Sequence, residues 1–219
     1  MQKTTDSAQR VFVVDDDPDV RDSLGMLLES VDLPYSLYAT AQAFLDDVEN
    51  VPVGCIVLDI RMPGMSGLEL QEELRHRELP LPIIFITGHG DISMAVKAMR
   101  LGALDFVTKP YHEQALLDRI HEALAQDASN RQLMYDHYER TKRISSLTPR
   151  EHQVFERVTD GLANKVIAFD LTVSERTVEV HRAQVMKKLG VRSVAELVRI
   201  RLEAERPLHE PVTASADAQ

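Results

Sequence analysis

Three consecutive aspartates, Asp15, Asp16 and Asp17, follow directly on the apolar run VFVV at residues 11–14. Two carboxylates about 4 Å apart repel each other by about 4 kcal/mol at an effective dielectric constant near 20. Such a cluster therefore needs a cation, a proton or ample water. A further aspartate, Asp59, lies in a second apolar run, CIVLDI. Oxygen ligands without a nearby imidazole or thiolate suit Mg²⁺, which keeps several waters and accepts phosphate oxygens, so these residues predict magnesium and a phosphate ligand.

Two further polar groups follow apolar runs in the same way, Thr87 after PIIFI and Lys109 after LDFVT. A lysine can supply a point charge to phosphoryl oxygens, and a threonine can supply a hydroxyl. Taken singly, each of these residues has an equally good structural explanation, such as a helix cap at Asp17 or a turn at Lys109–Pro110. Five polar groups at matching positions along the chain favour one shared site.

The elements that would position these groups alternate along the first half of the chain. Strand-like runs occupy residues 11–14, 35–38, 55–60, 82–87 and 104–109, and helical patterns follow them near 18–30, 41–48, 67–77, 91–101 and 112–125. Strand then helix, repeated five times, predicts a parallel sheet covered on both faces by right-handed crossovers. The carboxyl ends of such strands form a binding crevice, where we expect Asp15, Asp16, Asp59, Thr87 and Lys109 to meet.

The second half reads as helical throughout. Residues 126–146 lack Gly and Pro and predict a charged helical linker that continues the preceding helix. Thr148, Pro149 and Glu151 then form a helix start with a capping box, and Gly161 ends that helix. A short helix at 164–169, a turn at 170–173, a helix from Ser174 to Leu189 and a last helix to about residue 205 complete a helix-turn-helix plan. The tail after Pro207 is expected to be disordered.

Composition limits the class of protein. The 219 residues suffice for two domains, and the single cysteine, Cys55, has no partner for a disulfide or a zinc site. The net charge is −10, but residues 1–125 carry 10 basic and 21 acidic side chains, whereas residues 147–206 carry 11 and 9. A polyanion partner therefore belongs to the second half. The sequence has no signal-peptide pattern and no stretch that could span a bilayer, so we expect a soluble, cytoplasmic protein.

The helix from Glu175 to Leu189 has two distinct faces. Val178, Val185 and Leu189 should pack on the domain core, and the opposite stripe carries Arg176, Glu179, Val180, Ala183 and Lys187. In a major groove, glutamate can accept from cytosine and valine can touch a thymine methyl, while the basic residues, with Arg182, reach phosphates or guanine. A solvated helix in a protein-interaction bundle is the alternative, and His181 is equally well explained as a packed core histidine.

The motifs VVDDD, LDIRMPGMSG, FITGHGD and DFVTKP, in this order, resemble the receiver domain of two-component response regulators over residues 8–126. The segment from LTPRE to GVRS resembles the LuxR-type helix-turn-helix output domain, over residues 144–206, and the pairing is most similar to the FixJ subfamily. The resemblance implies a flavodoxin-like receiver with a five-stranded doubly wound α/β sheet, a helical linker at 127–143, a small all-α output domain of four helices, and a tail at 207–219.

The resemblance also implies roles for matching residues. Asp59 matches the phosphoacceptor. Asp16, Asp59 and the backbone carbonyl of Arg61 match the Mg²⁺ ligands, and Asp15 matches the acidic residue that orients metal-bound water. Thr87 and Lys109 match the residues that hold the phosphoryl group, Phe106 matches the aromatic switch, and the Lys109–Pro110 peptide is typically cis in this family. The residues expected at DNA are Asn164, Lys165, Ser174, Arg176, Thr177, Glu179, Val180, His181, Arg182, Ala183 and Lys187.

The expected function is that of a phosphorylation-controlled DNA-binding transcription factor, not a turnover enzyme. A sensor histidine kinase would phosphorylate Asp59, and the change would pass through Thr87 and Phe106 to a homodimer interface on the fourth helix, fifth strand and fifth helix. Promoter DNA is the expected partner, with RNA polymerase as a further candidate and no membrane. Two rivals remain: a phosphatase of similar topology, which needs an additional acid or base in the crevice, and a phospho-dependent adaptor that does not touch DNA.

Overall fold

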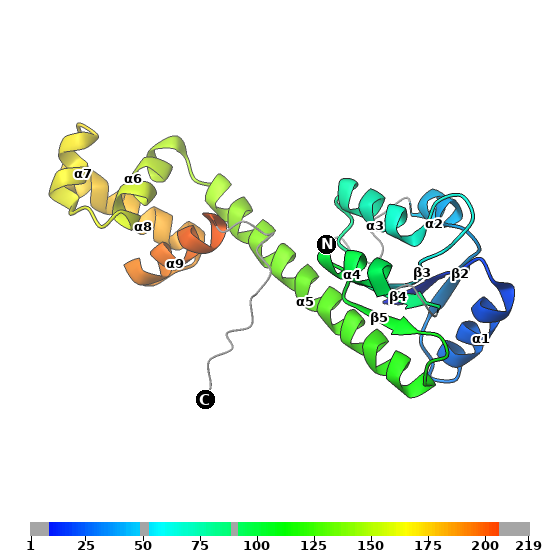
Figure 1. Ribbon diagram of the computed structural model, residues 1–219. Helices are drawn as coiled ribbons and strands as arrows, with labels where there is room; N and C mark the ends of the chain where they lie inside the picture. The colour runs from blue at the N-terminus through cyan, green and yellow to red at the C-terminus, as the bar shows by residue number, and fades with distance from the viewer. Residues whose placement is uncertain (1–8, 49–52, 89–91, 206–219) are drawn as a thin grey trace, which may run out of the picture. The chain divides into compact units, whose positions relative to one another are not determined.

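The computed structural model describes residues 9–48, 53–88 and 92–205, and the predicted tail at 207–219 and residues 89–91 of the FITGHGD motif lie outside this range. The chain divides into two compact units between residues 131 and 132. Figure 1 shows the elements of both units.

A five-stranded parallel sheet forms the first unit. Its strands are β1 (Arg10–Val14), β2 (Tyr35–Tyr38), β3 (Gly54–Asp59), β4 (Ile83–Thr87) and β5 (Asp105–Thr108), in the spatial order β2-β1-β3-β4-β5. All four pairings are parallel, so every strand ends at the same edge. The order reverses between β1 and β3, which places the predicted crevice above these two strands. The doubly wound fold predicted from the sequence is confirmed.

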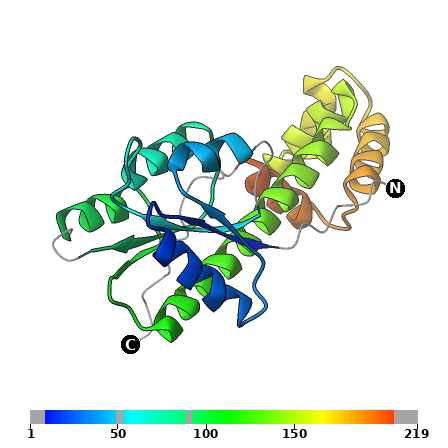
Figure 2. The same ribbon diagram turned by 90° about the vertical axis from the view of Figure 1, so that its right-hand side faces the viewer.

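Helices cover both faces of the sheet (Figure 2). Side chains of α1 (Pro18–Glu29) and α5 (Glu113–Ser145) pack with Val11, Val13, Cys55, Val57, Ile84 and Ile86 on one face. Side chains of α2 (Ala41–Asp47), α3 (Gly67–His76) and α4 (Ile92–Arg100) pack with Phe12, Val14, Ile56, Leu58, Ile83 and Phe85 on the other. Successive residues of a strand point to opposite faces, so apolar runs without alternation give a strand buried on both.

Local signals in the sequence account for the helix starts. Asp17 caps α1 by accepting from the Asp19 N–H, and Ser66 with Glu69 forms a complete capping box on α3. The structural explanation offered for Asp17, a helix cap, therefore holds, and the side chain is exposed. The helix α5 runs on without a break from the receiver into the predicted linker, over 33 residues.

The second unit contains α6 (Pro149–Thr159), α7 (Asn164–Asp170), α8 (Glu175–Leu189) and α9 (Val194–Glu205) around one apolar cluster. Thr148 and Glu151 form the predicted capping box, Ser174 caps α8, and Gly190 ends it at φ +70°. At the start of α9, Glu196 accepts from the Arg192 N–H, and its own N–H donates to Ser193 Oγ. Among the described helices, none has the length and apolar character needed to cross a membrane.

Candidate functional site

The ends of β1, β3 and β5 bring three charged side chains into direct contact. Lys109, just after β5, donates from Nζ to Asp15 Oδ2 at 2.9 Å and to Asp59 Oδ1 at 3.0 Å. Asp15 follows β1 and Asp59 is the last residue of β3. The lysine thus supplies the positive charge that two neighbouring carboxylates require.

Backbone N–H groups fix the remaining carboxylate oxygens. The Asp17 N–H donates to Asp15 Oδ1 at 2.9 Å, and the Arg61 N–H donates to Asp59 Oδ2 at 2.6 Å. Asp15 is 2% exposed and Asp59 is 9% exposed. Both aspartates are therefore oriented before any ligand arrives, and only a small part of Asp59 is exposed to solvent.

Burial raises the pKa of Asp59, and the neighbouring Asp15 adds to that effect, while Lys109 and the Arg61 N–H oppose it. For Lys109, burial alone would lower the pKa, but its bonds to the two carboxylates raise the pKa above the ordinary value. Lys109 therefore stays charged at neutral pH.

Of the other predicted residues, Asp16 and Thr87 lie at the same edge, whereas Phe106 lies within β5, opposite Phe85 of β4. Thr87, at the end of β4, is 2% exposed and its Oγ1 donates to the Gly88 carbonyl at 3.2 Å. Phe106 in β5 is 38% exposed, and Asp16 is exposed beside Asp15. The Lys109–Pro110 peptide is cis, as the resemblance implies.

Among the described residues, the acidic side chains of the site offer oxygen donors to a metal. Within the described part of the chain, no three His, Cys, Asp or Glu side chains converge closely enough to form a metal site by themselves. The space between Asp15 and Asp59 is instead filled by the Lys109 ammonium. Mg²⁺ is commonly bound by one or two carboxylates with water completing its shell, so this donor set fits Mg²⁺ without a third side chain.

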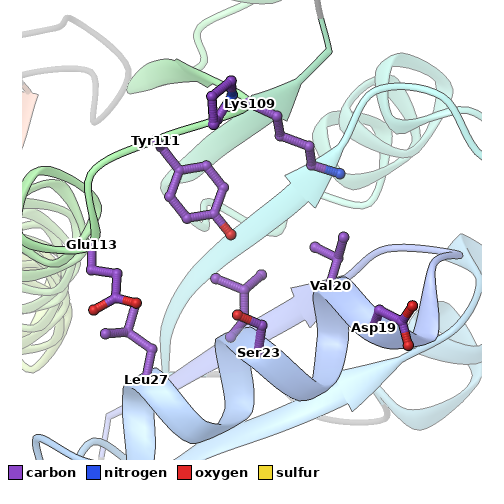
Figure 3. A pocket seen from close by; sticks show the side chains of 9 residues that line it. Asp19, Val20, Ser23, Leu27, Lys109, Tyr111 and Glu113 are labelled. Atoms are coloured by element: carbon purple, nitrogen blue, oxygen red, sulfur yellow. The ribbon is translucent and has the colours of Figure 1, made fainter.

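A pocket of about 370 Å³ opens beside Lys109, between α1 and the segment that follows β5 (Figure 3). Tyr111 and Glu113 line one side, and Val20, Ser23 and Leu27 of α1 line the other. The sequence analysis did not identify these residues. The available signal was that Tyr111 follows the Lys109–Pro110 pair, whereas the facing α1 residues read simply as an amphipathic helix.

The predicted DNA-binding residues gather on α8 and the start of α7. Val178, Val185 and Leu189 are buried as predicted, and the stripe of Arg176, Glu179, Val180, Ala183 and Lys187 is exposed. Val180 is 51% exposed, which is unusual for a valine in the middle of a helix. An exposed face of this mixed character remains suited to base edges and phosphates.

Other predicted residues support the shape of this surface. Ser174 accepts from the Thr177 N–H and so begins α8. Arg182 donates to Asn164 Oδ1, which joins α8 to α7, and Lys165 is exposed beside Asn164. His181 is half-buried, and its buried Nδ1 has no hydrogen-bond partner among the described residues. Arg182 therefore uses one of its donors to hold α8 and α7 together, and its other donors are left for a DNA contact.

Sequence analysis also missed the contact that anchors α8 from the other side. Lys188 donates from Nζ to Glu151 Oε2 at 2.6 Å, and the same oxygen accepts from the Thr148 N–H at 2.7 Å. These bonds lower the pKa of the buried Glu151 to about 2. The start of α6 and the end of the candidate recognition helix are therefore tied together.

Two family models match the chain in succession. Residues 11–121 match the response regulator receiver domain, and residues 145–201 match the bacterial regulatory proteins of the luxR family. The chain is 48% identical to the transcriptional regulatory protein FixJ of Azorhizobium caulinodans, across 89% of this chain and 92% of that protein. It is 44% identical to the response regulator protein TmoT of Ectopseudomonas mendocina, across 91% and 90% of the two chains.

Solved structures give the same relationship. The response regulator StyR is 47% identical and superposes with a TM-score of 0.81, over 89% of this chain and 98% of StyR. Full-length FixJ from B. japonicum is 42% identical with a TM-score of 0.57, over 90% of this chain and 97% of that structure.

Proposed function

The chain belongs to the response regulators of two-component systems, in the FixJ subfamily with a LuxR-type DNA-binding domain, and we propose that Asp59 is the residue through which it is controlled. The family assigns it a role as a phosphorylation-dependent transcription regulator. The residues proposed to receive the phosphoryl group lie at the strand ends of the receiver, and those proposed to contact DNA lie on α7 and α8.

The observation that carries the proposal is the shared contact of Lys109 with Asp15 and Asp59 at the mouth of β1 and β3. In phosphoryl transfer the nucleophile must lie in line with the leaving group, and positive charge must surround the equatorial oxygens. An oxygen of Asp59 would attack the phosphorus of a phosphohistidine, so that the P–N bond breaks as the P–O bond forms. The imidazole nitrogen leaves with the bonding pair.

Asp16, Asp59 and the Arg61 carbonyl would hold Mg²⁺, with Asp15 orienting a metal-bound water. The cation supplies positive charge to the phosphoryl oxygens when it is bound. Lys109 would move its contact from Asp59 to a phosphoryl oxygen, and the Thr87 hydroxyl would turn from the Gly88 carbonyl to another. Phe106 is half-exposed on β5, where a change at Thr87 could alter its rotamer.

The sensor histidine kinase implied by the receiver must bring its phosphohistidine next to Asp59. The pocket beside Lys109 supports such an approach, because Lys109 and apolar side chains of α1 line the same pocket. The hydrogen bonds to Asp59 in the described part of the chain come from Lys109 and the Arg61 N–H, and neither is the additional acid or base that the phosphatase rival needs.

Control of DNA binding is proposed to act through a homodimer. Val96 and Met99 of α4 and Phe106 of β5 are exposed apolar side chains on the face predicted for dimerisation. Two copies would bring two α8 helices to a symmetric promoter site, which raises their effective concentration on DNA. RNA polymerase as a further partner and a cytoplasmic location complete the proposal.

The test is phosphoryl uptake by the full-length protein from acetyl phosphate. Uptake should require Mg²⁺ and should disappear in Asp59→Asn, whereas Asp17→Asn should retain it because Asp17 serves as a helix cap. Labelling that persists in excess chelator, or in Asp59→Asn, would overturn the assignment.

A further inference from the structure

Asp127 is a buried carboxylate at the opposite edge of the sheet from the phosphoacceptor site. It lies in α5, is 1% exposed and accepts from the Gly54 N–H at 3.0 Å. The Arg131 Nε donates to both of its oxygens, at 3.0 Å and 2.9 Å. A buried charge is tolerated only when it is paired and hydrogen-bonded, so these contacts are needed to keep Asp127 where it is.

Gly54 is shaped to receive this contact. It opens β3 with φ +142°, and a Cβ built on it would lie 1.8 Å from the Arg10 carbonyl oxygen. Any other residue would push β1 and β3 apart at this end. Only a glycine thus permits the close backbone approach of β1 and β3 that accompanies the bond from Gly54 to α5.

A second bond ties the same stretch of α5 to the sheet. Gln9, just before β1, donates from Nε2 to the Leu124 carbonyl at 2.7 Å. The Arg10 N–H in turn donates to the Val53 carbonyl at 2.9 Å, which holds the starts of β1 and β3 together. The starts of both central strands are therefore fastened to one turn of α5.

This turn contains the last buried residue of α5, Asp127. The buried side chains of α5 are Leu116, Leu117, Ile120, Ala123, Leu124 and Asp127, and residues 128–145 of the helix, all of them described, add none. Beyond Leu124 the contact is polar, not apolar. The part of α5 without buried residues, which leads to the output domain, thus begins directly after Asp127.

The strand held by Asp127 also carries the phosphoacceptor. β3 runs from Gly54 to Asp59, and all six of its residues are buried. A buried strand in a packed sheet behaves as a rigid element. One strand therefore connects the proposed phosphorylation site at its carboxyl end with the root of the linker helix at its amino end.

We propose that Asp127 is a positioning residue that fixes the linker helix to the phosphoacceptor strand, so that the phosphorylation state of the receiver reaches the output domain. The inference rests on the proposed function of Asp59. Without the carboxylate, the Gly54 N–H would be buried without this partner and the last receiver turn of α5 would fray. A change in the receiver would then no longer be transmitted to the part of α5 that leads to the output domain.

The test uses the full-length protein with Asp127→Ala, Asp127→Asn and Arg131→Met. Asp136→Ala is the matched control, because Asp136 lies further along α5 and accepts from Gln132 Nε2 within the helix. Two quantities are measured for each variant. One is amide hydrogen exchange of residues 125–131, and the other is the ratio of DNA affinities with and without acetyl phosphate and Mg²⁺. The DNA is a site selected from random sequences by the phosphorylated wild type, and affinities are corrected for the phosphorylated fraction.

Loss of hydrogen bonds to a buried charge should accelerate exchange in Asp127→Ala by about tenfold or more. The affinity ratio should fall to about twofold or less, from a wild-type ratio within the 5- to 150-fold range typical of coupled sites. Asp127→Asn retains an acceptor for the Gly54 N–H, so its exchange rate and its affinity ratio should lie between those of Asp127→Ala and the wild type. Asp136→Ala should match the wild type in both quantities. Should Asp127→Ala fail to fold, the other two variants carry the same test.

An affinity ratio that stays at the wild-type value while exchange accelerates would overturn the proposal, since Asp127 would then only stabilise the helix. Unchanged exchange and an unchanged ratio would overturn it as well. A wild type whose DNA affinity does not respond to phosphorylation would instead refute the proposed function of Asp59, and this outcome is visible before any variant is compared.

Discussion

The Nζ of Lys109 lies 3.0 Å from Oδ1 of Asp59, although 50 residues separate the two in the chain. The same ammonium contacts Asp15 Oδ2 at 2.9 Å. The crevice therefore carries its own cation before Mg²⁺ arrives. Asp59 is both a contact of Lys109 and a proposed Mg²⁺ ligand, so the lysine should compete with the metal for this carboxylate.

Lys109→Met should tighten Mg²⁺ binding, because Asp15 and Asp59 would face each other without a neutralising charge. Relief of this repulsion by Mg²⁺ should lower the dissociation constant for Mg²⁺ by about tenfold or more relative to the wild type. Isothermal titration with MgCl₂ measures it directly. Lys97→Met is the control. Lys97 is exposed, and its Nζ lies 3.6 Å from Glu72 Oε1 and does not pair with Asp15 or Asp59. Equal Mg²⁺ affinity in Lys109→Met and the wild type would show that the lysine does not compete.

Gly67→Ala should destabilise the receiver, because a Cβ at this position would lie 2.2 Å from the Asp59 carbonyl oxygen. Overpacking next to β3 should cost about 2 kcal/mol or more. Urea denaturation followed by circular dichroism gives the loss. Gly102→Ala separates steric from backbone effects: its Cβ would meet nothing within 4 Å, but its φ is +93°. A cost of about 1 kcal/mol is expected there, and a smaller loss for Gly67→Ala than for Gly102→Ala would contradict this account.

The stability of the output domain should depend on pH through Glu151. The hydrogen bond from Lys188, followed by that from the Thr148 N–H, lowers the pKa of Glu151 from 4.5 to about 2 in the folded state. A lowered pKa means that the stabilisation is complete above about pH 4.5 and is lost as the pH falls from 4.5 towards 2. Glu151→Gln should flatten the loss of stability in this window.

Hydrogen exchange of α6 and α8 amides between pH 2 and 5, corrected for intrinsic rates, measures this dependence. Glu156→Gln is the control, because Glu156 is exposed on the same helix. If Glu151→Gln and the wild type lose protection in parallel, the Lys188 contact does not hold the carboxyl in its charged form.

Glu179→Ala and Lys187→Ala should affect DNA binding in different ways. Both residues are exposed on α8. Loss of a base contact should change the preferred base at one position of the site, whereas loss of a phosphate contact should weaken all sequences and reduce the salt slope by about 1. Binding to a randomised site library at several salt concentrations separates the two effects. Equal, sequence-independent losses would mean that Glu179 reads no base.

The sequence predicted the parts of this structure that depend on local patterns. Apolar runs fully buried in a parallel sheet lack alternation, and the runs ending near Asp15 and Asp59 became β1 and β3. The cap at Asp17 was predictable because an aspartate stands directly before Pro18 at the start of the helix. The box of Thr148 and Glu151 was predictable because a capping box pairs residues three positions apart. Positions of polar groups at strand ends followed from the same reasoning.

Contacts between distant segments were not predictable from such patterns. Nothing local indicates that Lys109 would share its ammonium between two aspartates, or that Asp127 would accept from Gly54, 73 residues away. Glu151 was recognised as a capping residue, but its bond to Lys188 depends on how α6 packs on α8. Side-chain pairing across elements depends on packing geometry, which a single sequence does not display.

The most direct test of the central claim is the DNA affinity of the full-length wild type and Asp59→Asn, each with and without acetyl phosphate and Mg²⁺, at one salt concentration. Solution mass is recorded for the same samples. Phosphorylation should raise the affinity of the wild type about 5- to 150-fold and double its mass, while Asp59→Asn should respond in neither respect. An equal gain in both proteins, or no gain in a wild type that has taken up the phosphoryl group, would contradict control through Asp59.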